Sequence, residues 1–138
     1  MATFLADKSA LTRHETRPEV REVLEPLLVT GEIATCGIVD LELLYSAVSR
    51  TVYRSLSEAL RGMPRATVDE RCIGRALEVQ AMLAERSQHR SVPLPDLIVA
   101  ACAETEGLVV LHYDADFERI AELTGQPTQW IVPRGSVA

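Results

Sequence analysis

The sequence lacks any apolar run long enough to cross a membrane. A helical span needs about 20 consecutive apolar residues, and no stretch of this chain approaches that length. The first apolar run, residues 4–6, is broken at once by Asp7 and Lys8, so the amino terminus does not have the pattern of a signal peptide. We therefore expect a cytoplasmic protein that has no membrane partner.

Cysteine is scarce, and its spacing excludes two common kinds of site. Cys36, Cys72 and Cys102 are odd in number, far apart and without a C-x-x-C pair. This pattern does not suit a zinc site or a disulfide framework, and it predicts reduced, mostly buried thiols. The three histidines likewise show no spacing typical of metal ligands. A catalytic cysteine paired with a histidine stays open as an alternative.

Basic side chains are fewer than acidic ones and are almost all of one type. The chain has 14 Lys and Arg against 20 Asp and Glu, a net charge of −6, and Lys8 is its only lysine. A negative chain argues against a nucleic-acid partner, but cations bound to a cluster of acids would leave the remaining surface near neutral. Arginine is the better bidentate ligand for phosphate, although a GC-rich genome also favours its codons. Charge alone therefore decides nothing about nucleic acid.

Hydrophobic periodicity and turn residues predict strands alternating with helices in one domain, residues 1–138, with a loose tail at 133–138. The expected strands are residues 3–6, 33–36, 66–68, 108–111 and 129–132. The expected helices are residues 18–29, 39–49, 52–60, 70–85, 95–106 and 116–123. The strand at 108–111 is apolar without alternation, as in a parallel sheet covered on both faces. We predict an α/β fold, a three-layer α/β/α domain with a mostly parallel central sheet of about 4–5 strands.

Four carboxylates each adjoin an apolar run: Asp7, Glu42, Asp96 and Asp114. Drawing a carboxylate toward a core costs several kcal/mol unless something compensates its charge. A divalent cation held by oxygen ligands would compensate all four together. Asp7 and Asp114 each follow a predicted strand, and ligands of parallel sheets bind beyond the carboxyl ends of the strands. The sequence therefore predicts a metal-dependent active site at this edge.

Each acid also has a local alternative that involves no metal. Asp7 can cap the turn that follows its strand, and Glu42 can face solvent on a helix. Asp96 follows a proline at a predicted helix start, which is an ordinary N-cap position. Asp116 is divided between a place among the metal ligands and an N-cap for the helix from residue 117. Asp40, two residues before Glu42, is expected to point elsewhere.

Four segments, in order, resemble the four acidic elements of PIN-domain ribonucleases of the VapC toxin type. They are FLADKSAL from residue 4, ELLYSA from residue 42, HRSVPLPDLIVAA from residue 89 and VLHYDADF from residue 110. The resemblance implies a PIN-like fold with Asp7, Glu42, Asp96 and Asp114 as catalytic acids. These four and Asp116 would be the metal ligands, and Ser9 would support Asp7 by hydrogen bonding. The implied ion is Mg²⁺, with Mn²⁺ as a substitute. Lys8, His112 and Tyr113 depart from the commoner residues of the family.

The same resemblance implies a toxin that hydrolyses RNA with a metal-activated water and is neutralised by a small VapB-type antitoxin. A homodimer is also implied. The predicted helices over 19–28 and 52–60 are candidates for the antitoxin groove. No motif identifies the residues that bind RNA; position alone suggests Arg13, Arg17, Arg50 and Arg54.

Three other functions stay open at this point. The chain can be a housekeeping PIN nuclease in RNA processing, or a PIN-like module that binds RNA or protein without cutting it. An aspartyl phosphatase is a further idea, prompted by Asp114-Ala115-Asp116, but that chemistry places its D-x-D after the first strand. The RNA target, the number of metal ions and the oligomeric state are not indicated.

Overall fold

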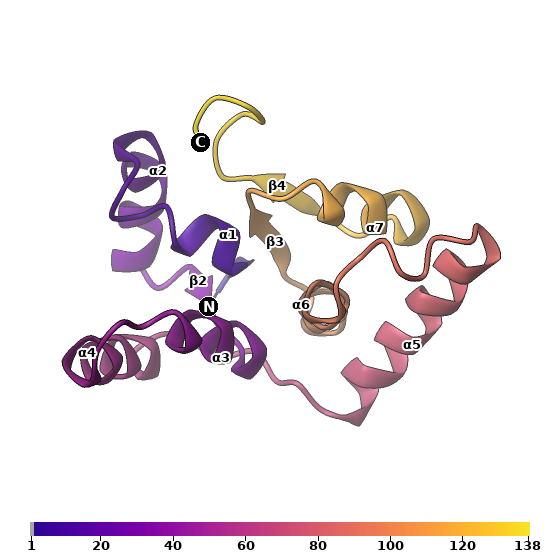
Figure 1. Ribbon diagram of the computed structural model, residues 1–138, viewed down its shortest axis with the longest axis horizontal. Helices are drawn as coiled ribbons and strands as arrows, with labels where there is room; N and C mark the ends of the chain where they lie inside the picture. Colours follow the sequence, from indigo (N-terminus) through magenta and orange to yellow (C-terminus); the bar gives the residue numbers. More distant parts are fainter. Residues whose placement is uncertain (1) are drawn as a thin grey trace.

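A parallel four-stranded sheet lies at the centre of the computed structural model, which describes residues 2–138 (Figure 1). The strands are β1 (Phe4–Ala6), β2 (Ile33–Ala34), β3 (Val109–His112) and β4 (Thr128–Trp130), in the order β2-β1-β3-β4. All three pairings are parallel, with Leu5 opposite both Ala34 and Val110. The predicted α/β class and parallel sheet are confirmed.

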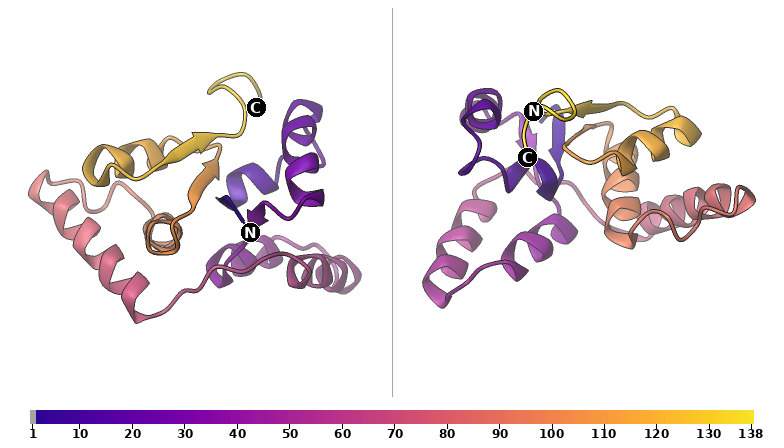
Figure 2. Two further views of the ribbon diagram at one scale, coloured as in Figure 1. Left: turned by 180° about the vertical axis from the view of Figure 1, so that it is seen from behind. Right: turned by 45° about the horizontal axis from the view of Figure 1, so that its top comes forward.

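Seven helices of the described chain cover this sheet on both faces. They are α1 (Lys8–Leu11), α2 (Pro18–Val29), α3 (Gly37–Tyr45), α4 (Arg50–Arg61), α5 (Glu70–Glu85), α6 (Leu94–Glu106) and α7 (Asp116–Thr124). Successive strand residues point to opposite faces, so Val110 packs with α3 to α7 while Leu111 packs with α1 and α2. This is the predicted three-layer arrangement. In Figure 2, α5 lies on the far side of α6 from the strands.

One predicted strand is absent, and several predicted boundaries are wrong, most clearly between α3 and α4. Residues 66–68 form no strand, because only Thr35 and Arg65 make an isolated bridge there. The helix predicted over 39–49 ends at Tyr45, and Val48, which lies inside the predicted range, is 92% exposed beyond the end of the helix. Ser49 begins the next helix by accepting a hydrogen bond from Val52 N at 3.2 Å. The break between α3 and α4 therefore comes earlier in the chain than the hydrophobic pattern predicts, because the Ser49 hydroxyl caps α4.

Capping residues define the ends of two long helices, and the predicted burial of the cysteines is confirmed. Asp69 caps α5 by accepting a hydrogen bond from Cys72 N at 3.0 Å. Gly107 ends α6 in the left-handed conformation, with φ of 70°. All three cysteines are free and buried, so they are not placed to meet a substrate. Among residues 2–138, no helix is both long and apolar enough to cross a bilayer.

The tail after Pro133 carries no helix or strand but contacts the end of β3. The Tyr113 hydroxyl accepts hydrogen bonds from Gly135 N at 2.9 Å and Val137 N at 3.2 Å, and it donates to Val137 O at 2.7 Å. The looseness of this tail is a matter of motion and stays a prediction.

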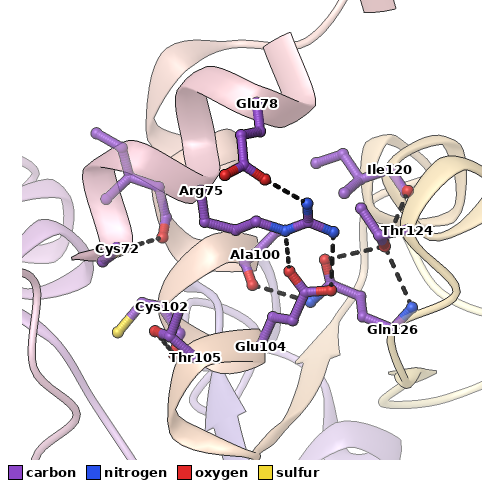
Figure 3. Close-up of polar contacts among 11 residues, drawn as sticks. Cys72, Arg75, Glu78, Ala100, Cys102, Glu104, Thr105, Ile120, Thr124 and Gln126 are labelled. Atoms are coloured by element: carbon purple, nitrogen blue, oxygen red, sulfur yellow. Dashed lines mark hydrogen bonds and ion pairs between the residues drawn. The ribbon is translucent and has the colours of Figure 1, made fainter. Parts of the chain in front are cut away.

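A polar network ties α5, α6 and the turn between α7 and β4 together (Figure 3). The Arg75 guanidinium donates to Glu104 through Nε and Nη2 and to Glu78 Oε2 through Nη1, the last at 2.9 Å. Gln126 Nε2 donates to Ala100 O at 2.8 Å, and the Gln126 side chain is buried. Because α6 carries Asp96, these contacts help to fix the helix that delivers an acid to the site.

We expect Gln126→Leu to lower the free energy of unfolding by about 1 kcal/mol, because it removes a buried hydrogen bond at nearly constant volume. Urea unfolding measures this change. Gln129→Leu is the matched control, since Gln129 is exposed in β4 and surface substitutions change stability by about 0.5 kcal/mol or less. Equal effects of the two substitutions would show that the Gln126 bond contributes nothing.

Candidate active site

Three carboxylates meet at the carboxyl edge of the sheet. Asp114 follows β3, Asp116 is the first residue of α7, and Asp96 lies in the first turn of α6. One oxygen of each lies within 4.8 Å of one oxygen of each of the others. Segments far apart in the sequence thus deliver acids to one point, as the sequence predicted for a ligand site beyond the strand ends.

Asp96 is buried and its carboxylate is not used as a cap. The residue is 4% exposed, and its Oδ2 atom is buried without a hydrogen-bond partner. The N-cap alternative is wrong, because α6 begins at Leu94 after Pro93 and makes no side-chain capping bond. A buried, unpartnered carboxylate oxygen costs several kcal/mol, so its position calls for a cation.

Asp7 both caps a helix and keeps a free oxygen. Its Oδ2 accepts a hydrogen bond from Ser9 N at 3.0 Å at the start of α1, while Oδ1 is buried without a partner. The Ser9 hydroxyl in turn accepts from Tyr113 N at 2.9 Å and joins the ends of β1 and β3. The capping alternative for Asp7 therefore leaves one oxygen available to a ligand.

Burial and mutual repulsion shift the titration of these acids. Desolvation raises the pKa of Asp96 to about 8, and the charges of Asp7 and Asp114 add to this rise. Burial also raises the pKa of Asp7, against the lowering effect of its bonds with Ser9. The pKa of Asp116 rises chiefly through burial and then through Asp114. Three raised carboxyl pKa values in one place mark a site whose negative charges are not fully balanced by the neighbouring basic side chain.

Glu42 lies on the Asp7 side of the site and is paired with a lysine. Its Oε2 atom lies 2.9 Å from Lys8 Nζ, and its Oε1 atom is buried without a hydrogen-bond partner. Glu42 is not one of the three mutually close carboxylates. The alternative of a fully solvated Glu42 is not observed, since its side chain is 16% exposed. Its role as a metal ligand stays a prediction.

His112 positions the fourth acidic segment, a role that the sequence did not suggest. Its Nδ1 atom accepts a hydrogen bond from Asp114 N at 3.1 Å, and its ring packs against Phe117 and Trp130. Burial lowers the pKa of His112 to about 4, so the ring is neutral at pH 7. With Nδ1 accepting, the proton of the neutral ring is on Nε2. A histidine ending an apolar strand next to an acid was the only signal of this arrangement.

Asp114 holds the start of α7 in place. Its Oδ1 atom accepts a hydrogen bond from Asp116 N at 2.9 Å. The helix begins at Asp116 itself and has no side-chain cap from that residue, so the N-cap alternative for Asp116 is not observed. Asp114 makes the local bond, and the Asp116 carboxylate points into the cluster of acids instead.

We expect His112→Phe to weaken Mn²⁺ binding about tenfold while leaving the free energy of unfolding within about 1 kcal/mol of the parent, because Phe keeps the ring packing. Only the acceptor for Asp114 N is lost. Calorimetric titration with Mn²⁺ measures the first quantity and urea unfolding the second. His89→Phe, at an exposed position, is the control. Unchanged Mn²⁺ affinity in His112→Phe would remove His112 from any positioning role.

Two further predictions concern charged residues around the site. Asp40 points elsewhere as expected, since it pairs with Arg65 and accepts from the Thr35 hydroxyl at 2.7 Å. Arg13, one of four arginines suggested for RNA, donates to Ser9 O at 2.6 Å and stacks on the Tyr113 ring at 4.5 Å. Its guanidinium is thus engaged by the protein itself, and the role of the other three stays a prediction.

Comparison with known proteins agrees with this geometry. The chain matches the PIN domain family over residues 4–123. It is 45% identical to Ribonuclease VapC18 of Mycobacterium tuberculosis over 136 residues, 97% of this chain and 98% of the relative. It is 47% identical to Ribonuclease VapC51 of the same organism over 134 residues, 97% of this chain and 96% of the relative.

Solved structures share the fold at lower sequence identity. DNA-bound VapBC from Salmonella typhimurium contains a chain with a TM-score of 0.74 and 21% identity, covering 96% of this chain and 100% of that chain. A chain of VapBC2 from Rickettsia felis has a TM-score of 0.76 and 17% identity, covering 93% of this chain and 98% of that chain. With the family match and the relatives above, the protein belongs to the PIN-domain family and, within it, to the VapC ribonucleases.

Proposed function

We propose that this protein is a Mg²⁺-dependent endoribonuclease that acts as the toxin of a toxin–antitoxin pair. The observation that carries the proposal is the cluster of Asp96, Asp114 and Asp116 oxygens within 4.8 Å, next to a buried Asp7 with an unpartnered oxygen. A set of oxygen ligands alone selects hard cations such as Mg²⁺ or Mn²⁺ over zinc or copper. The names of its close relatives support RNA as the substrate.

Each side chain of the site would have its own role in the reaction. Asp96, Asp114 and Asp116 would hold the ion, which when bound makes a coordinated water more acidic and neutralises phosphate charge. The free Oδ1 of Asp7 lies at the same edge and would orient the attacking water by hydrogen bonding. Ser9 and His112 keep Asp7 and Asp114 in position through the backbone bonds described above. No covalent nucleophile is needed, which agrees with the burial of every cysteine.

The proposal is tested with purified protein and total cellular RNA, in Mg²⁺ and in EDTA. We expect discrete fragments that carry 5′-phosphates and 3′-hydroxyls in Mg²⁺ and intact RNA in EDTA. Sequencing the fragment ends identifies the target. An absence of cleavage by folded protein in both Mg²⁺ and Mn²⁺ would favour a module that binds without cutting. Growth arrest on expression in cells distinguishes a toxin from a housekeeping nuclease.

We propose a VapB-type antitoxin as the protein partner. The structural relatives named above are VapBC complexes, and the two helices expected to receive an antitoxin border an apolar groove here. Leu28 of α2 and Leu56 and Leu60 of α4 line this groove, together with Leu43 and Met63. Co-expression with the small protein encoded beside it should yield a complex in which Leu28, Leu56 and Met63, the partly exposed side chains of this groove, lose solvent exposure. A stable complex that leaves this groove exposed would contradict the placement.

We also propose a homodimer. Leu41 and Tyr45 of α3 are 65% and 92% exposed and line the same surface hollow, and exposed apolar side chains that lie together mark contact surfaces. Light scattering coupled to size-exclusion chromatography measures the mass directly. A monomer at all accessible concentrations would contradict this proposal and leave the nuclease proposal untouched.

A further inference from the structure

Lys8 is the one lysine of the chain, and it lies directly beside the acids. It follows Asp7, begins α1 and places Nζ 2.9 Å from Glu42 Oε2. Asp7 and Asp96 also attract this ammonium electrostatically. Its side chain is 47% exposed and lines a surface hollow with Leu41, Glu42 and Tyr45. A positive charge is therefore built into one side of the site.

The acids of the site form two groups, and only one of these groups is paired with the Lys8 ammonium. Asp96, Asp114 and Asp116 lie within 4.8 Å of one another, and among residues 2–138 none of them makes an ion pair within 4 Å. Glu42 lies outside this group and is neutralised by Lys8. Asp7 belongs to neither arrangement alone: it precedes Lys8 directly in the chain, and the charges of both Glu42 and Asp114 raise its pKa.

Sites that use two metal ions hold them about 4 Å apart, each with its own share of carboxylates. In this chain the three-acid group provides one such share, and no basic side chain among residues 2–138 forms an ion pair with it. The second share, Asp7 and Glu42, already faces an ammonium. We propose that the Lys8 ammonium takes the place of a second divalent cation beside Asp7 and Glu42, so that this protein binds a single metal ion at Asp96, Asp114 and Asp116.

This inference rests on the proposed metal site and deepens it. It assigns Glu42 the task of holding Lys8 rather than the ion, and so replaces its predicted role as a ligand. It also gives a reason for the lysine at position 8, where the family more often has an uncharged residue. The ammonium lies at the open side of the site, where it would contact a phosphate oxygen of bound RNA.

The test is the number of bound Mn²⁺ ions, measured by calorimetry and by electron paramagnetic resonance in the absence of RNA. We expect one ion for the parent protein and two for Lys8→Met, which removes the charge and keeps an unbranched side chain. Lys8→Arg keeps the charge and should still bind one ion. Glu42→Gln should also bind one ion, with affinity within about threefold of the parent, because Glu42 is not its ligand.

Thermal unfolding without metal supplies a second measurement. Losing the half-exposed pair should lower the Tm of Lys8→Met by about 3 °C, and Mn²⁺ should raise its Tm more than that of the parent. Two ions in the parent, one ion in Lys8→Met, or loss of the ion in Glu42→Gln would each overturn the role of Lys8 and leave the nuclease proposal standing. No Mn²⁺ binding by the folded parent would overturn the metal site itself.

Discussion

Asp96→Asn should lower the rate of RNA cleavage by about a thousandfold while the protein keeps its fold. The substitution conserves shape but replaces a charged oxygen with an amide that donates hydrogen bonds. Electrostatic groups aimed at the reacting centre contribute about a hundredfold to a thousandfold each, and a lost metal ligand removes both the ion and the water it orients. Asp96 belongs to the three-acid cluster and offers an unpartnered oxygen.

The stability of this variant separates catalysis from folding. The Asp96 carboxylate is buried without a partner, so removing its charge should leave the metal-free protein at least as stable as the parent at pH 8. Asp69→Asn is the matched control, because Asn also caps helices well and Asp69 caps α5 away from the acids. Single-turnover cleavage of labelled RNA gives the rates. Asp96→Asn with more than about a tenth of the parent rate would contradict a role in holding the ion.

The convergence of the acids was predictable from the sequence because it depends on chain direction. In a parallel sheet every strand ends at the same edge, so Asp7 after β1 and Asp114 after β3 were expected at one edge, and the direct pairing of β1 with β3 brings them together. The apolar runs on either side of each acid indicated burial. These patterns are local, so they give the same prediction even when the boundaries of a strand or helix are wrong by a few residues.

The individual tasks of the acids were not predictable in the same way. Proline before Asp96 favours an N-cap, yet the helix starts two residues earlier and leaves the carboxylate free. Asp116 has the sequence of a cap, but the backbone bond goes to Asp114. The contact of Lys8 with Glu42 joins residues 34 positions apart, and no spacing rule connects them. Whether a carboxylate caps a helix or pairs with a lysine depends on small differences in its position, and tertiary packing determines that position.

The metal-free protein should lose about 1–2 kcal/mol of unfolding free energy between pH 6.5 and pH 8. In the folded chain Asp96 keeps its proton up to a pKa of about 8, whereas an unfolded aspartate has lost its proton above pH about 4. The folded state therefore binds more protons in this range, and stability falls as the pH rises, by at most about 1.4 kcal/mol per pH unit for one carboxyl group.

Below pH 6.5, His112 changes the free energy of unfolding in the opposite direction, so the loss due to Asp96 is clearest between pH 6.5 and pH 8. Its folded pKa of about 4 lies below the unfolded value of about 6.5. Between these values the unfolded chain binds the additional proton, so the histidine makes stability rise with pH up to about 6.5 and has no further effect above it. Below pH 6.5 the contributions of Asp96 and His112 oppose each other, and above it His112 no longer opposes the contribution of Asp96.

Urea unfolding in EDTA at pH 6.5 and pH 8 measures the loss, and two comparisons assign it. Asp96→Asn should remove most of the dependence, because its amide does not titrate; a dependence equal to that of the parent would mean that another group carries it. Saturating Mg²⁺ should also flatten the dependence, since an ion holds the carboxylates in their charged form and releases their protons on binding. The carboxyl group that destabilises the metal-free protein at pH 8 is the one that the ion needs deprotonated. Mg²⁺ affinity should therefore rise over the same pH range in which metal-free stability falls.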